Sequence, residues 1–375
     1  MIGAGVFLLP ATMAAYQGIG IIGWVIASLG ALMLAVIFGK LSKMYPKVNG
    51  GPYAYSRIGL GDFAGFLVAW GYWISIWCTN AAIAVALVGY LGVFFPDLTG
   101  NPFLASLTGL FFIWFFTWIN SKDIKTIGAV QVLTTVLKVI PIAFLILVGF
   151  FYVDFSKVFV FPFKSGSMLP DITAVTTLTF FAFLGMESAT VPSNSISSPE
   201  KTIEKATLFG TLFTTVLYVL SFIVIIGIIP PETLANSTAP FADTAFEIWG
   251  KTGKYLVAFG AIASTMGALN GWILLQGQIP ASAARDNLFP KLFEKSNKNG
   301  APIRGIIFSS ILATILMLCN YSKTLVEAFS YMMKLSTLTV LLPYLFSIAT
   351  FALALKNTNK KSLVLAALAF IFSLW

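Results

Sequence analysis

Long apolar stretches with almost no charge inside them recur along this chain. A helix needs about 20 apolar residues to cross the hydrocarbon core of a bilayer. Nine stretches approach or exceed that length: 20–39, 63–95, 103–119, 126–152, 172–192, 206–229, 255–277, 305–320 and 335–355. A single soluble core cannot explain this repetition, so the sequence predicts an all-α, polytopic membrane protein embedded in the lipid bilayer.

Composition excludes several other classes. Of the 375 residues, 58% are hydrophobic, only 10% are charged and none is histidine. A His-based metal site or catalytic triad is therefore excluded, and we expect neither a cofactor nor enzymatic activity. A channel would need a ring of charges or a repeated filter sequence, and the sequence contains neither. The net charge of +9 could suggest a nucleic-acid partner, but Lys and Arg lie in short loops rather than on one surface, so none is expected.

The basic residues predict the orientation in the membrane. Of the 23 Lys and Arg residues, sixteen lie in alternate loops, among them Lys40, Arg57 and Arg285, and five lie in the intervening loops. By the positive-inside rule the richer set of loops faces the cytoplasm. We therefore expect a multi-pass protein of the cell inner (plasma) membrane.

Two short glycine-containing motifs interrupt the apolar stretches. The first is Gly3-Ala4-Gly5, and the second, about 180 residues later, is Phe183-Leu184-Gly185-Met186-Glu187-Ser188. Each begins a block of about five spans, so the second block inserts in the opposite sense. Inverted repeats whose broken helices meet at the midplane form the substrate sites of many transporters. Glycines that only let helices pack closely are the alternative explanation.

These blocks predict one transmembrane transporter domain over 1–375. The first repeat covers about 1–152 and the second about 171–355, with a partial further span at 362–375. Because the stretch 2–17 is interrupted by glycines and 362–375 is short for a span, we expect about 11 of 12 spans, the first and last partial. An inactive product truncated at both ends is an alternative that this pattern leaves open.

Glu187 is the only one of fourteen acidic residues that lies deep inside an apolar stretch. An ionised side chain at the bilayer centre costs on the order of 3 kcal/mol or more, so such residues persist mainly where they line a cavity or relay charge. We therefore predict that Glu187 senses protons. A structural carboxylate, hydrogen-bonded to the backbone or to a tyrosine hydroxyl, is the alternative.

The interrupted motifs also predict how a solute is held. A helix that starts at Gly3-Ala4-Gly5 would offer free N–H groups and a positive dipole end to a carboxylate. Freed carbonyls of Phe181 and Leu184 would accept hydrogen bonds from an ammonium group. Together they favour an α-amino acid as the small-molecule substrate.

Two side chains inside spans have an open role. Trp272 follows small residues and could stack on a guanidinium or ammonium group, but packing within the bundle is equally compatible with the sequence. Asn80 is a mid-span amide, which more often bridges helices than contacts a substrate.

Two motifs carry a family resemblance: Gly3-Ala4-Gly5-Val6-Phe7-Leu8-Leu9-Pro10 and Gly50-Gly51-Pro52-Tyr53-Ala54-Tyr55. They resemble the signatures of the amino acid–polyamine–organocation (APC) transporter superfamily. The further run Asp286-Asn287-Leu288-Phe289-Pro290 looks like the basic amino-acid/polyamine antiporter branch. That branch exchanges arginine for agmatine, lysine for cadaverine or ornithine for putrescine, and the resemblance covers essentially the whole chain.

The resemblance implies a LeuT-like fold of two inverted five-helix repeats with broken helices. It also implies roles for individual residues: Glu187 as the proton sensor, Tyr72 and Tyr344 as the inner gate, Trp272 as the middle gate, and Asn80 and Ser336 as substrate contacts. The sequence departs from the arginine exchanger at two positions. Ala4 replaces a serine of the first break, and Phe181 replaces the outer-gate tryptophan.

The activity that the resemblance implies is alternating-access exchange of a cationic amino acid (arginine, lysine or ornithine) for its decarboxylated amine. A broader-specificity amino-acid:proton symporter of the same superfamily is the alternative. The resemblance also raises the expectation of a homodimer.

Overall fold

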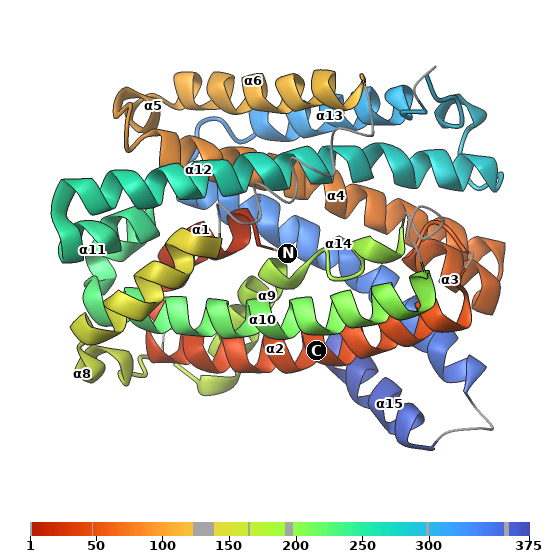
Figure 1. The fold of residues 1–375 in the computed structure, drawn as a ribbon, viewed down its shortest axis with the longest axis horizontal. Helices are drawn as coiled ribbons and strands as arrows, with labels where there is room; N and C mark the ends of the chain where they lie inside the picture. The colour runs from red at the N-terminus through yellow and green to blue at the C-terminus, as the bar shows by residue number, and fades with distance from the viewer. Residues whose placement is uncertain are drawn as a thin grey trace.

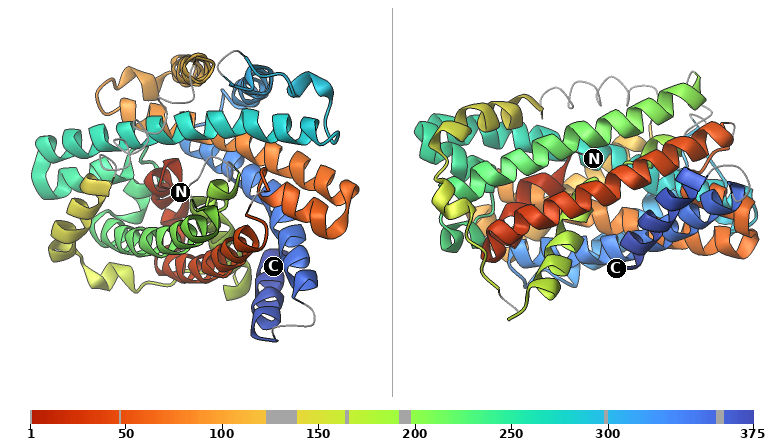
Figure 2. Two further views of the ribbon diagram at one scale, coloured as in Figure 1. Left: turned by 45° about the vertical axis from the view of Figure 1, so that its right-hand side comes forward. Right: turned by 90° about the horizontal axis from the view of Figure 1, so that it is seen from below.

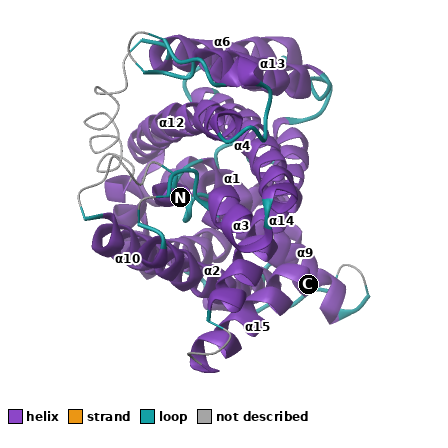
Figure 3. Ribbon diagram, turned by 90° about the vertical axis from the view of Figure 1, so that its right-hand side faces the viewer, coloured by secondary structure: helices purple, strands orange, loops and turns teal. Residues whose placement is uncertain are grey.

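The fold comes from a computed structural model, which describes residues 2–46, 48–122, 139–163, 166–191, 198–297, 300–355 and 360–375. All regular structure within these ranges is helical (Figure 3). The longer helices are α2 (Gly18–Met44), α4 (Asp62–Leu91), α6 (Pro102–Asn120), α10 (Pro199–Ile228), α12 (Pro240–Arg285), α13 (Ile303–Leu318) and α14 (Leu325–Ala354). The shorter ones are α1 (Ala4–Met13), α3 (Pro52–Leu60), α5 (Asp97–Gly100), α8 (Phe155–Val158), α9 (Met168–Phe180), α11 (Pro231–Ala235) and α15 (Lys360–Leu374). The all-α prediction is confirmed.

Seven helical segments of the described chain are long and apolar enough to cross a membrane. They are Gly18–Met44, Asp62–Leu91, Pro102–Asn120, Met168–Thr190, Lys201–Ile228, Pro240–Arg285 and Leu325–Ala354. Each matches one predicted stretch. The stretch 305–320 forms the 16-residue α13, which is short for a span, and 126–152 begins outside the described residues.

The surface of the bundle is apolar. Phe111, Trp114 and Trp118 of α6 are exposed, as are Leu212 and Phe213 of α10. Exposing these apolar side chains to water would be unfavourable, whereas contact with lipid carries no such cost. The packing of the helices therefore agrees with a bilayer as their solvent.

The helices form layers around the start of the chain (Figure 1). α2 and α10 run side by side along one edge, α6 and α13 along the other, and α12 crosses the molecule between these pairs. The first turn of α1 lies in the middle of the bundle in every view (Figure 2). Gly250, at φ +64°, separates a short outer segment of α12 from its long membrane segment.

Contacts at the two ends of the bundle agree with the predicted orientation. At one end of the bundle, Lys43 pairs with Glu204 at 3.9 Å, and Asn297 Nδ2 donates to the Ser121 carbonyl at 2.6 Å. Both contacts join segments that the charge distribution assigns to the cytoplasm. At the other end, the Phe241 amide donates to the Tyr90 hydroxyl at 3.3 Å, joining segments that the charge distribution assigns to the outside. The two ends are called cytoplasmic and outer below according to this predicted orientation.

Candidate functional site

The two interrupted motifs meet in the middle of the bundle. The first opens α1, and the second ends α9 and continues as two short 3₁₀ turns, η3 (Phe181–Phe183) and η4 (Ser188–Thr190). Gly5 packs so closely on the second motif that an added Cβ would lie 3.0 Å from Ala182 Cα and 3.4 Å from a ring carbon of Phe181. Glycine at position 5 therefore lets the two breaks touch.

Unusual backbone geometry separates η3 from η4. Gly185 adopts φ +94°, a left-handed conformation that other residues rarely adopt. The Leu184 amide donates to the Phe181 carbonyl at 3.1 Å. This carbonyl, one of two predicted to receive a substrate ammonium, therefore already accepts an internal hydrogen bond, although its second lone pair can accept another.

Glu187 lies between η3 and η4 and is completely buried. Its Oε2 accepts a hydrogen bond from the Tyr344 hydroxyl of α14 at 2.8 Å. The Tyr72 hydroxyl of α4 lies beside the same carboxylate but makes no well-directed hydrogen bond, and Oε1 has none either. The structure thus brings the predicted proton sensor and the two predicted inner-gate tyrosines into one buried cluster, in which the Tyr72 hydroxyl and Glu187 Oε1 have no hydrogen-bond partner among the described residues.

The start of α1 lacks a side-chain cap. Gly3 is extended there, and the first N–H groups of any helix have no partner inside the helix. Ala4 and Gly5 are buried, so these donors face the interior of the bundle. One turn later the Tyr90 hydroxyl donates to the Phe7 carbonyl at 2.9 Å. Tyr90 was not predicted from the sequence, because a tyrosine near a span end usually anchors at the interface.

Aromatic rings close the outer side of the breaks. Phe181 packs edge-to-face on Phe329 of α14, with ring centroids 5.9 Å apart. Trp272 is only half-buried, on α12, and among the described residues it has no ring contact with Phe181 or Phe329. The structure therefore places Phe181 at the breaks but does not bring Trp272 to it.

Asn80 and Ser336 both lie in helix–helix contacts. Ser336 Oγ is 2.9 Å from Ser75 Oγ and 2.7 Å from Thr79 Oγ1, which ties α14 to α4. Asn80 Nδ2 donates to Gln276 Oε1 of α12 at 2.7 Å. Gln276 was not predicted from the sequence, although it is a mid-span amide like Asn80.

A charged cluster caps the cytoplasmic end below the breaks. Asp286, at the end of α12, accepts from Arg57 Nη1 and from the Tyr53 hydroxyl of α3, both at 3.1 Å. Arg57 Nε also pairs with Asp62 at 2.6 Å, and this bond raises the pKa of the guanidinium. Burial and the Asp286 charge raise the pKa of Tyr53, so its hydroxyl stays protonated and donates. Tyr53, Arg57 and Asp286 line a cavity of about 330 Å³.

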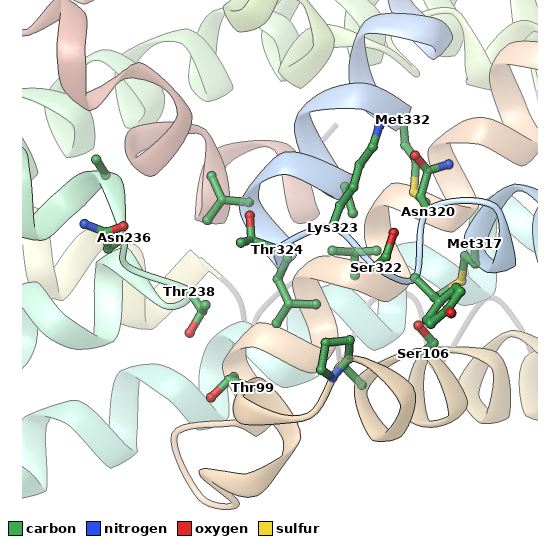
Figure 4. A pocket seen from close by; sticks show the side chains of 18 residues that line it. Thr99, Ser106, Asn236, Thr238, Met317, Asn320, Ser322, Lys323, Thr324 and Met332 are labelled. Atoms are coloured by element: carbon green, nitrogen blue, oxygen red, sulfur yellow. The ribbon is translucent and has the colours of Figure 1, made fainter.

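A second cavity, of about 310 Å³, opens at the outer end (Figure 4). Thr99 and Ser106 line it from one side, and Asn320, Lys323 and Thr324 from another. No predicted site residue lines it. It lies beside the aromatic closure, since Ala328, the neighbour of Phe329, forms part of its wall.

Comparisons with known proteins agree with this geometry. The family described as amino acid permease matches residues 1–375. The chain is 30% identical to an arginine/ornithine antiporter of Pseudomonas aeruginosa, over 100% of this chain and 82% of the relative. It is 31% identical to the putrescine transporter PotE of Escherichia coli, over 96% and 82%.

A solved structure of MhsT in complex with L-phenylalanine has the same fold. The TM-score is 0.65 at 14% identity, and the match covers 100% of this chain and 94% of that one. The predicted LeuT-like architecture is therefore confirmed. The chain belongs to the amino acid permease family of the APC superfamily, in its basic amino-acid/polyamine antiporter branch.

Proposed function

We propose that this protein exchanges a cationic amino acid (arginine, lysine or ornithine) for its decarboxylated amine across the bacterial inner membrane. The observation that carries the proposal is the contact between the start of α1 and the irregular segment after α9, with a buried carboxylate beside them. Relatives named as arginine/ornithine, putrescine and cadaverine/lysine transporters support the substrate class.

The solute binds between the breaks. Its carboxylate meets the uncapped N–H groups of Ala4 and Gly5, where the positive end of the helix dipole favours an anion. Its ammonium group lies toward the second break, where Leu184 begins the irregular backbone. A decarboxylated amine keeps the second contact and loses the first, so the same site accepts both exchange partners.

Two closures of different chemistry isolate this site. On the outer side Phe181 meets Phe329, and on the cytoplasmic side Tyr344 donates to Glu187. Alternating access results if one closure opens while the other closure stays shut. Protonation of Glu187 would remove the charge that Tyr344 stabilises, which makes the inner closure sensitive to pH.

Counterflow into proteoliposomes tests the exchange. Vesicles loaded with unlabelled arginine, lysine, ornithine or putrescine should accumulate the labelled partner, and empty vesicles should not. Uptake driven by a proton gradient into empty vesicles would instead identify the symporter. Absence of counterflow with all four solutes would reject the substrate class.

The Glu187→Gln variant tests the role of the carboxylate. We expect its exchange rate to vary less than about 2-fold between pH 5 and 8, because the amide cannot titrate, whereas the wild type should vary about 10-fold or more. The matched control is Glu327→Gln, since Glu327 is exposed and the amide can preserve its capping box with Thr324. A Glu187→Gln profile that follows the wild type would remove Glu187 from proton sensing.

A further inference from the structure

A buried hydrogen-bond relay connects α13 to Asn80. Gln276 Nε2 of α12 donates to the Ile306 carbonyl at 3.1 Å and to Ser310 Oγ at 2.8 Å, both on α13. Gln276 Oε1 then accepts from Asn80 Nδ2 of α4 at 2.7 Å. Neither amide side chain is exposed to any measurable extent (0% for both).

The relay fixes the orientation of both amides. A backbone carbonyl can only accept a hydrogen bond, so Gln276 must present its NH₂ group to Ile306. Its oxygen is then turned to α4, and Asn80 must meet that oxygen with its own NH₂ group. Flipping either amide would bring two acceptors together within hydrogen-bonding distance.

One acceptor remains without a donor at the end of this relay. Asn80 Oδ1 is the second branch of the same planar amide, and it is buried with no hydrogen-bond partner among the described residues. Buried polar atoms are nearly always paired, so an unpaired acceptor in a transporter core is suited to a donor that arrives with a ligand.

The position of Asn80 on α4 agrees with that role. Tyr72 and Tyr90 lie on one face of this helix, and both contact the broken helices or their neighbours. Asn80 comes eight residues after Tyr72, which at 3.6 residues per turn places it roughly 80° round the helix. It therefore lies at the edge between the face toward the breaks and the face toward α12.

We infer that Gln276 is a positioning residue that makes Asn80 an obligate hydrogen-bond acceptor, so that the central site selects solutes whose side-chain end offers N–H donors. The inference deepens the proposed function and rests on it. Ammonium and guanidinium groups carry donors only, and they satisfy Oδ1. A solute of the same shape with a carbonyl oxygen at that place would bind less well, because its lone pairs would face those of Oδ1.

The test compares lysine with 2-amino-6-oxoheptanoate, a lysine analogue whose chain ends in a methyl ketone and therefore offers only an acceptor at that end. In Gln276→Met the amide of Asn80 is free to flip and to offer its NH₂ group. We expect the ratio of the two inhibition constants in counterflow to fall about 10-fold, mainly because the ketone binds better. Gln276→Leu tests the same expectation if the Gln276→Met variant does not reach the membrane.

A second change restores the acceptor without the relay. In the double variant Asn80→Asp, Gln276→Met, both branches of residue 80 are acceptors, so discrimination against the ketone should return. A residue that only held helices together would not be rescued in this way, because aspartate adds no bond to α12.

Two controls separate positioning from general stability. Ser310→Ala leaves the Ile306 carbonyl as the anchor of Gln276, and Asn120→Leu removes the α6–α12 bond to Asn270 at 2.8 Å without touching the relay. Both should keep the wild-type ratio. Unchanged discrimination in Gln276→Met and Gln276→Leu, with normal exchange, would overturn the inference. A wild type that transports no cationic solute would instead overturn the proposed function.

Discussion

The two ends of the molecule are closed by different chemistry. Toward the cytoplasm, the contacts are polar and charged: Tyr344 with Glu187, and Arg57 and Tyr53 with Asp286. Toward the outside, Phe181 packs on Phe329, with no charge between them. Charged contacts weaken with salt and with protonation, whereas ring packing depends on shape and volume. The inner closure should therefore respond to pH and charge, and the outer closure to side-chain size.

The largest expected effect is at the contact between the start of α1 and the second glycine motif, which lies between the two closures. In Gly5→Leu the side chain must displace Ala182 and Phe181, because a Cβ at this position already lies 3.0 Å from Ala182 Cα. We expect counterflow to fall about 100-fold, since a 1 Å displacement within a site can cost that much. The matched control is Gly100→Leu, where an added Cβ meets no atom within 4 Å. Exchange near the wild-type rate in Gly5→Leu would mean that the breaks need not stay in contact.

A smaller effect should follow when the cytoplasmic cluster loses one charge. Asp286→Asn removes the ion pair that joins α3 to α12, while Arg57 keeps Asp62. Partly exposed ion pairs contribute about 0.2–1 kcal/mol, so inward opening should become about 1.5- to 5-fold more frequent. The measurement is the labelling rate of Ser347→Cys by a cytoplasmic thiol reagent, in a background with Cys78→Ala and Cys319→Ser. Ser347 is buried one turn beyond Tyr344 on α14.

The control for this experiment is Asp62→Asn. This change removes the ion pair between Arg57 and Asp62, which does not connect α3 to α12. Its labelling rate should stay near that of the background. High salt should raise the rate in the background protein and have little effect in Asp286→Asn, because the screened ion pair is already gone. Equal rates in all three proteins would show that this cluster does not hold the inner end closed.

The sequence predicted the helices well because length and hydropathy are local properties. Each of the seven long helical segments lies on a predicted stretch, the first glycine motif coincides with the start of α1, and the second coincides with the irregular segment after α9. The gate cluster was accessible only through the family resemblance, since Glu187 and Tyr344 are 157 residues apart. The relay through Gln276 and the pairing of Arg57 with Asp286 depend on how each helix is rotated about its axis. Hydropathy does not specify that rotation.

The smallest expected effect is at the outer closure. Phe181→Trp keeps an aromatic ring against Phe329 and adds indole, whose face attracts cations more strongly than phenyl. If arginine is the substrate, its affinity should rise about 1.5- to 2.5-fold, corresponding to roughly 0.2–0.5 kcal/mol, because phenyl already supplies part of the attraction to the cation. The measurement is the inhibition constant of arginine in counterflow, with Phe181→Leu as the control that removes the ring. Because no charge is added or lost, the pH profile should follow the wild type, and a shifted profile would mean that the outer closure is coupled to Glu187.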